Sequence, residues 1–234
     1  MKGKIHMRAV PVAAILASCF TLATALLGGC SSRGGWTASE LETISSTVPG
    51  TDSLGTSILR VLTIADHADS LVLRTECADF TPAMLQSPEF AALSSLMLAT
   101  VQDPSEDGVG IAGPQVGISR RIVAVQRFDK PGEPFEVYPN IRIVGFNGDT
   151  APGPEGCLSV PGLRGDVMRF RDIEISYTLI GPTSDGQPGV ALVPRDTTER
   201  VQGFTAVIFQ HECDHLDGVL YIDKVIPGTL RESD

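Results

Sequence analysis

The stretch from His211 to His215, which reads His-Glu-Cys-Asp-His, restricts the fold of this chain more than any other feature. On a helix, residues four apart differ by only about 40° in direction, so His211 and His215 can present their imidazoles to one metal ion. Glu212 lies one position further round, where a carboxylate can act as general base for a water at that ion. Cys213, about 200° from His211, is expected to face away and to pack as a buried thiol.

The same pattern also arises by chance in helices, so its surroundings matter. The chain has only four histidines, and two of them lie at ligand spacing in an otherwise apolar helix, where unpartnered imidazoles are costly. A catalytic zinc-type site needs three protein ligands and an open position, and the third ligand could be any Glu, Asp, His or Cys. Cys157 stands out because Gly156 beside it lets the backbone approach a ligand closely. The alternative is that Cys157 is a small buried hydrophobe.

The hydrophobic pattern predicts an α+β domain. Apolar residues at intervals of three to five predict a helix from about Ser87 to Gln102, and a second helix is expected from about Val201 to Leu216, with Gly218 as a left-handed cap. Between them the period falls to two, which predicts strands near 122–125, 137–146 (interrupted by Pro139), 172–180 and 189–193. Without internal repeats, this order indicates α+β rather than repeated βαβ units.

The composition excludes one class of partner. Of the residues, 42% are hydrophobic and 20% are charged, which fits an ordinary globular domain. Eighteen basic residues against 28 acidic ones give a formal net charge of −10. We therefore expect no nucleic acid to be bound, since such binding depends on neutralising phosphates.

The first 35 residues differ from the rest of the chain. Basic residues without an acidic one precede an apolar run over residues 9–28, which leads into Leu27-Gly28-Gly29-Cys30-Ser31. This resembles a bacterial lipoprotein signal, in which small residues precede a cysteine that is lipidated and becomes the mature N-terminus. Two alternatives are an uncleaved membrane helix and a misassigned start of the chain.

Three further segments follow one another along the chain. They are Gly108-Val109-Gly110-Ile111-Ala112-Gly113-Pro114-Gln115, then Glu155-Gly156-Cys157-Leu158-Ser159, then Gln210-His211-Glu212-Cys213-Asp214-His215. In order and spacing they resemble the three motifs of the peptide deformylase family, and the likeness extends over about residues 55–226. The first segment departs from the family pattern at Gly113, where alanine is usual. The resemblance implies a peptide-deformylase-like α+β fold, with mostly antiparallel strands packed around a C-terminal metal-binding helix.

The resemblance also implies a metal site. Cys157, His211 and His215 would bind one divalent ion, which is Fe(II) in the family, although a thiolate with two imidazoles would also accept Zn, Ni or Co. Glu212 would act as general base and then as general acid. Glu155, beside this site, is expected to be an ion-pair partner of Arg169 rather than a catalyst.

The remaining implied roles concern the substrate. The side-chain amide of Gln115 and the backbone N–H of Leu158 would form the oxyanion hole. The residues implied in substrate binding are Gly110, Val109, Phe204, Val207, Ile208 and Arg164.

The implied activity is hydrolysis of the N-formyl group of formyl-methionyl peptides. One alternative is a conventional H-E-x-x-H metallopeptidase, which Cys157 disfavours because His2Glu is the usual ligand set there. The other is a lipid-anchored protein that binds metal or formyl-peptides without catalysis. The presence of Glu212, Gln115 and Leu158 disfavours that alternative.

These features divide the chain into three parts. Residues 1–29 are the expected signal peptide, residues 30–53, rich in Ser, Thr and Gly, are an expected flexible tether, and residues 54–234 are the deformylase-like catalytic domain. Lipid on Cys30 would make the membrane a partner and the cell envelope the location. If the signal is not used, the expected location is the cytoplasm, where deformylases act on nascent chains.

Overall fold

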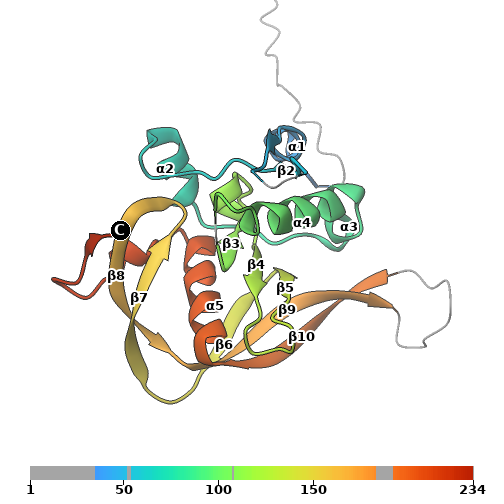
Figure 1. The fold of residues 1–234 in the computed structure, drawn as a ribbon. Coiled ribbons are helices and arrows are strands. Elements are labelled where there is room, and N and C mark those ends of the chain that lie inside the picture. The colour runs from blue at the N-terminus through green and yellow to red at the C-terminus, as the bar shows by residue number, and fades with distance from the viewer. Residues whose placement is uncertain (1–34, 52–53, 107, 183–191, 234) are drawn as a thin grey trace, which may run out of the picture. The chain divides into compact units, whose positions relative to one another are not determined.

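The computed structural model describes residues 35–51, 54–106, 108–182 and 192–233 (Figure 1). The expected signal peptide, residues 1–29, and the expected lipidation site Cys30 lie outside the described residues. Within the part that is described, no helix has both the length and the apolar character that crossing a membrane requires.

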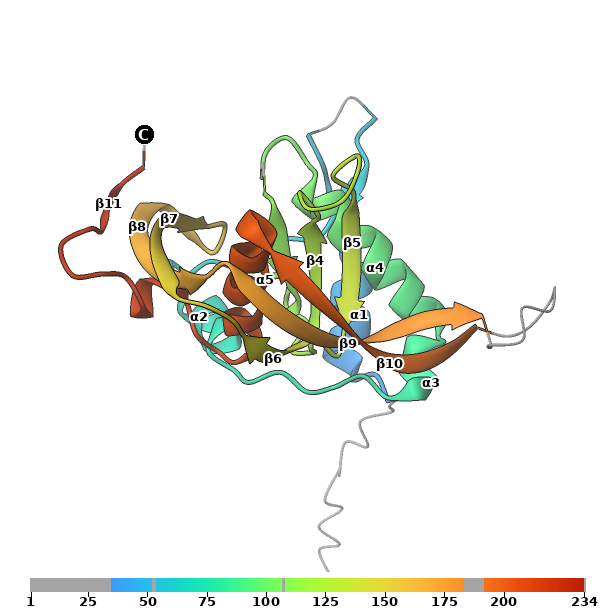
Figure 2. The same ribbon diagram turned by 90° about the horizontal axis from the view of Figure 1, so that it is seen from below.

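Small antiparallel sheets lie around one helix, α5 (Gly203–Leu216), as Figure 2 shows. The first sheet, in the order β3-β4-β5, consists of Gly110–Ala112, Ile122–Gln126 and Phe135–Pro139. The second, β10-β9-β6, consists of Leu192–Gln202, Asp172–Pro182 and Arg142–Phe146. The third, β11-β8-β7, consists of Arg231–Glu232, Val160–Phe170 and Thr150–Cys157. All of these strands pair antiparallel, so the predicted α+β fold class is confirmed.

The two long helices form where the apolar period predicts them. α4 (Pro88–Val101) begins after Ser87, whose hydroxyl accepts a hydrogen bond from the Phe90 N–H and so caps the helix. α5 is buried along most of its length, and it contacts β3, β4 and β10. Gly218, with a φ of +71°, provides the predicted left-handed residue just beyond α5.

The strand expected over residues 137–146 is in fact two strands. Pro139 ends β5, and Asn140, with a φ of +55°, turns the chain before β6 begins at Arg142. Proline cannot donate to a sheet ladder, so a strand ends there readily. The sequence does not predict the long β7–β8 hairpin, because its glycines and prolines obscure the alternation that identifies a strand.

Trp36 lies within the segment expected to be a flexible tether, yet its side chain is fully buried. Its ring packs edge-to-face on Phe80, and its Nε1–H donates a hydrogen bond to Ser87 Oγ at 3.0 Å. It belongs to the same core cluster as the buried face of α4. For residues 36–51 the expectation of a flexible tether, made over residues 30–53, is wrong, because burial of the indole stabilises an ordered chain.

The helix that follows Trp36 confirms this correction. α1 (Ala38–Ser45) begins with a capping box, in which Thr37 Oγ1 accepts from the Glu40 N–H and the Glu40 carboxylate accepts from the Thr37 N–H. The Glu40 carboxylate also pairs with Arg120, just before β4. Thr-Ala-Ser-Glu is a recognisable capping box in the sequence, so a Ser/Thr-rich composition was the weaker signal.

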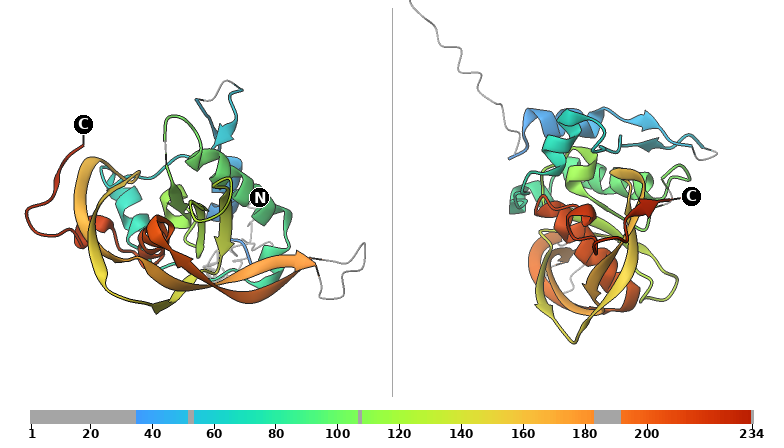
Figure 3. Two further views of the ribbon diagram at one scale, coloured as in Figure 1. Left: turned by 60° about the horizontal axis from the view of Figure 1, so that its bottom comes forward. Right: turned by 90° about the vertical axis from the view of Figure 1, so that its left-hand side faces the viewer.

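Short elements complete the fold. They are β1 (Val48–Pro49), β2 (Ser57–Ile58), α2 (His67–Leu73), α3 (Pro82–Leu85) and the 3-10 helices η1 (Gly113–Val116) and η2 (Tyr221–Asp223). β1 pairs with β2, and β2 contacts α4. Figure 3 shows α1 and this strand pair on the α4 side of the domain, away from β9 and β10.

Candidate metal centre

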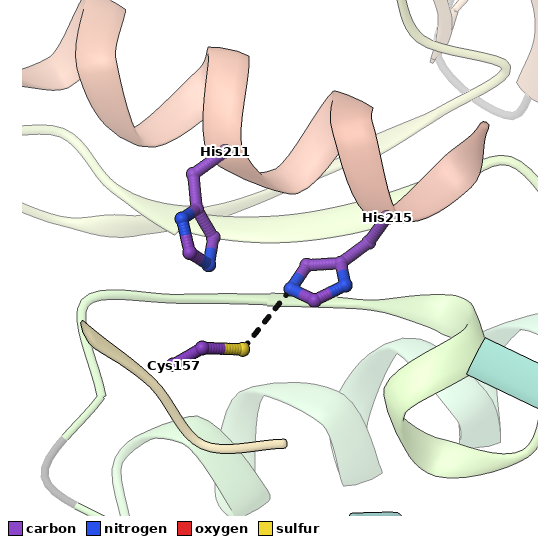
Figure 4. A group of neighbouring side chains, drawn as sticks. All are labelled: Cys157, His211 and His215. Atoms are coloured by element: carbon purple, nitrogen blue, oxygen red, sulfur yellow. Dashed lines mark hydrogen bonds between the residues drawn. The ribbon is translucent and has the colours of Figure 1, made fainter. Parts of the chain in front are cut away.

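Three side chains with ligand atoms meet between β7 and α5 (Figure 4). Cys157 is the last residue of β7, while His211 and His215 lie one turn apart on α5. The Cys157 Sγ and one ring nitrogen of each histidine all lie within 4.8 Å of one another, and Sγ is 3.2 Å from His215 Nε2. The structure therefore brings the expected ligand set together. A thiolate with two imidazoles is a donor set that suits a divalent transition ion.

Glu155 orients one of these imidazoles. Its Oε2 lies 2.8 Å from His211 Nδ1, so a proton on Nδ1 is held there and Nε2 keeps its lone pair for a metal. The expected ion pair with Arg169 is confirmed, since Arg169 Nε donates to Glu155 Oε1 at 2.7 Å. Burial would raise the pKa of Glu155, but the hydrogen bonds from His211 and Arg169 outweigh it and lower that pKa to about 2. Glu155 thus acts on the site through His211, which the sequence alone did not indicate.

A pocket of about 430 Å³ opens in front of this group. It is lined by every residue expected to act in catalysis or to bind substrate, namely Glu212, Gln115, Leu158, Gly110, Val109, Phe204, Val207, Ile208 and Arg164. Cys157 and His211 also line it. His215 is buried and does not line the pocket, and Cys30 lies outside the described residues.

The apolar side of the pocket comes from the first turns of α5. Phe204, Val207, Ile208 and His211 follow one stripe of the helix, so an apolar surface continues into the metal ligands. Phe204 is 48% exposed, and its ring lies 5.4 Å from that of Phe128. An apolar side chain bound along this stripe would be buried away from water, next to the ligand group.

Glu212 faces the pocket from α5. Its side chain is buried, and its Oε2 has no hydrogen-bond partner among the described residues. Burial raises the pKa of Glu212 to about 7. Gly110 lies directly against it, because a Cβ at position 110 would be 2.5 Å from Glu212 Oε1 and 2.8 Å from Ile208 Cγ2. Only glycine permits this approach, which explains the residue type at that position.

Gln115 on η1 is held in one orientation. Its Oε1 accepts from the Ala112 N–H at 2.8 Å, and its Nε2 donates to Ser159 Oγ at 3.2 Å and lies 3.5 Å from Cys157 Sγ. The amide N–H group therefore faces the ligand group. Ser159 is fully buried and belongs to the second motif, so its place in the sequence could have identified it.

Gly113, where the family resemblance leads us to expect alanine, fits the backbone of this chain closely. A Cβ at position 113 would lie 2.6 Å from the carbonyl oxygens of both Ile118 and Arg120. Alanine would therefore require the loop after η1 to shift. Two other pocket residues, Glu106 and Ser233, carry no signal in the sequence, because loop path and strand pairing alone bring them there.

Cys213 lies away from the ligand group, as the helix geometry predicts. It is buried, together with Cys77, in the core cluster formed by α5, β4 and β9, and both are free thiols. Burial raises the pKa of the Cys77 thiol to about 12 and that of Cys213 further. Both residues are therefore neutral packing thiols rather than ligands.

The fold and the ligand group together define a metal-dependent hydrolase with one Cys-His-His centre beside a pocket of about 430 Å³. Residues 58–230 match the family model described as polypeptide deformylase. The chain belongs to that family. This membership agrees with the motifs, and the Cys ligand leaves no observation in favour of a conventional metallopeptidase.

Individual relatives agree with this membership. A peptide deformylase from Leptospira biflexa is 33% identical over 161 residues, which cover 66% of this chain and 82% of that protein. One from Symbiobacterium thermophilum is 41% identical over 122 residues, which span 50% of this chain but only 48% of the relative. The actinonin-bound class I type b peptide deformylase of Acinetobacter baumannii aligns with a TM-score of 0.58 and 31% identity, covering 72% of this chain and 99% of that structure.

Proposed function

We propose that this protein is a metal-dependent hydrolase that removes the N-formyl group from formyl-methionyl peptides. The observation that carries this proposal is the convergence of Cys157, His211 and His215 beside a pocket into which Glu212 also faces. The relatives named peptide deformylase support it, as does a related Acinetobacter baumannii structure that is bound to Met-Ala-Ser.

The metal would be held by Cys157 Sγ and by one ring nitrogen each of His211 and His215. Held by these three residues, a divalent ion would supply Lewis-acid chemistry and would lower the pKa of water toward neutral pH. Fe(II) is the ion that the family resemblance implies, and Zn, Ni or Co would suit the same donors. Glu155 fixes the His211 ring, so the donor geometry is set before the ion binds.

The remaining chemistry belongs to the side chains of the pocket. Glu212, with its unpaired Oε2, takes a proton from the attacking water and passes it to the departing amine. The Gln115 amide, aimed at the ligand group, and the Leu158 N–H donate hydrogen bonds to the formyl oxygen as negative charge develops on it.

Binding of the peptide uses the apolar and basic parts of the same pocket. The methionine side chain packs on Phe204, Val207 and Ile208, with Val109 on the facing wall. Gly110 leaves room for the peptide backbone beside Glu212, and Arg164 offers a cation to the carbonyl groups further along the peptide.

Formate release from formyl-Met-Ala-Ser tests this function directly. The purified protein loaded with Fe(II), Co or Ni should release one formate for each molecule of formyl-peptide consumed. Removal of the ion with a chelator should abolish the release, because water is then no longer activated. Acetyl-Met-Ala-Ser serves as the control substrate and should be cleaved far more slowly. Loaded protein that binds its ion and releases no formate would contradict the proposal.

We also propose that Cys30 carries lipid and places the catalytic domain at the cell envelope. The support is the composition of residues 1–32, with a basic start, an apolar run and Leu-Gly-Gly-Cys. Palmitate labelling in a bacterial host should mark the natural chain and not its Cys30→Ala variant. Equal labelling of the two would exclude lipid at Cys30.

A further inference from the structure

The wall of the pocket opposite α5 includes described residues of the segment between α4 and β3, which are residues 102–106 and 108–109. Its residues Glu106, Gly108 and Val109 line the pocket, next to Gly110 at the start of β3. None of the metal ligands lies in this segment, since they come from β7 and α5. Its conformation therefore affects the space for substrate more directly than it affects the ion.

Asp103, near the start of this segment, is 3% exposed, and its carboxylate accepts four hydrogen bonds. Its Oδ2 accepts from the Thr51 N–H at 2.7 Å, and its Oδ1 accepts from the Thr51 hydroxyl. Oδ1 also accepts from the Ser105 N–H at 3.0 Å and from Ser105 Oγ at 2.7 Å. We call these three residues the Asp103 latch. Hydrogen bonds from neutral donors to a carboxylate are among the stronger ones in proteins.

The strand pair β1–β2 approaches Asp103 closely at Gly50. Gly50 donates its N–H to the Thr56 carbonyl at 2.8 Å, which closes the pair directly beside Thr51. A Cβ on Gly50 would collide with Asp103 Oδ2 and would lie 2.6 Å from the Thr56 carbonyl oxygen. Glycine is thus needed for the close approach. Residues 36–57 lie outside the part of the chain that matches the family model.

Backbone contacts connect the latch to the pocket wall. The Asp103 carbonyl accepts from the Glu106 N–H at 2.9 Å, and the Gly108 N–H donates to the Val101 carbonyl at 3.3 Å. The Gly108 backbone packs against Leu158, because a Cβ there would lie 3.2 Å from Leu158 Cδ1. Beyond it, the Val109 carbonyl accepts from Gln126 on β4. The segment is held at both ends, and its first end is held by Asp103.

We propose that Asp103 is a positioning residue for substrate binding, and that the β1–β2 strand pair supports the pocket wall through it. The proposal rests on the deformylase activity inferred above. Asp103 touches neither ligands nor substrate, so loosening the latch widens the range of wall conformations in the free protein. Substrate must then order the wall on binding, which raises KM. The ligand group and Glu212 are unchanged, so kcat is retained.

The test compares two threonine-to-valine variants. Thr51→Val removes a hydroxyl that donates to Asp103. Thr75→Val removes the hydroxyl of another exposed threonine, which follows α2 and donates to the Leu71 carbonyl within that helix. We expect KM for formyl-Met-Ala-Ser to rise about fivefold in Thr51→Val, as for the loss of one hydrogen bond, with kcat within about twofold of wild type. Thr75→Val should leave both parameters unchanged.

Two further measurements separate positioning from general stability. Amide hydrogen exchange should become faster in Thr51→Val over residues 101–110 and should stay unchanged in α5, and this readout needs no activity. Asp103→Asn keeps one acceptor oxygen, which can still accept from the Ser105 donors, and should raise KM less than Asp103→Ala. If Asp103→Ala does not fold, the threonine pair still decides the question.

The outcomes are distinct. Equal KM values for Thr51→Val and Thr75→Val would overturn the proposal, and so would a parallel fall of kcat, metal content and melting temperature in Thr51→Val. A wild-type protein that binds metal without releasing formate would instead overturn the proposed activity. In that case the exchange measurement alone decides whether the latch holds the wall.

Discussion

Replacing Glu212 with alanine is expected to lower kcat/KM for formyl-Met-Ala-Ser at least about 100-fold, as for the loss of a general base. The side chain is buried, faces the pocket, and has an oxygen without a partner among the described residues. A carboxylate in that position is available to accept a proton from water. The measurement is formate release at several substrate concentrations, with the bound metal determined for each preparation.

Two controls make this result specific to proton transfer. Glu212→Gln keeps the volume of the side chain and should lose activity to a similar extent, which excludes a cavity as the cause. Glu42→Ala removes an exposed carboxylate from α1 and should keep full activity. Metal content should match wild type in all three variants, because Cys157, His211 and His215 remain. If Glu212→Ala keeps the rate of the wild-type protein, another group moves the proton.

Replacing Trp36 with alanine should lower the free energy of unfolding by about 3–5 kcal/mol, as for other large buried aromatic residues. The variant loses the contact with Phe80 and the hydrogen bond to Ser87 Oγ. Because Trp36 is the only tryptophan of the chain, unfolding is best followed by circular dichroism in increasing denaturant.

The matched variant for this measurement is again Glu42→Ala, an exposed position on the helix that follows Trp36. Its effect should stay within about 0.5 kcal/mol, as for surface substitutions without special contacts. Equal stability of the two variants would mean that the N-terminal segment is not part of the cooperative core.

The parts of the site that could be predicted from the sequence are those encoded locally. His211, Glu212 and His215 are close in the chain, and the helical period alone places two imidazoles together with a carboxylate beside them. Cys157 needed the family resemblance, because nothing local shows that β7 ends beside α5. The reason for glycine at position 110 is likewise not local, because it appears only when Glu212 packs against Gly110.

Other parts depended on partners distant in the chain. Glu155 could be paired with Arg169 from the sequence, but its contact with His211 needs β7 and α5 in place. The hairpin β7–β8 lacks a clean alternation, and the strand expected over residues 137–146 divides at Pro139. The Asp103 latch joins residues 52 positions apart, and no periodic pattern connects them.

By itself the sequence determined the chemistry of this protein: a helix with two imidazoles and a carboxylate, three ordered motifs, and an α+β alternation of periods. Tertiary structure alone decided that the Cys157 sulfur lies beside the imidazoles, that Glu155 orients the His211 ring, and that Trp36 belongs to the core. The physical reason is range. Helical geometry and capping act over four residues or fewer, whereas ligand convergence, burial and close glycine contacts exist only after segments far apart in the chain have packed together.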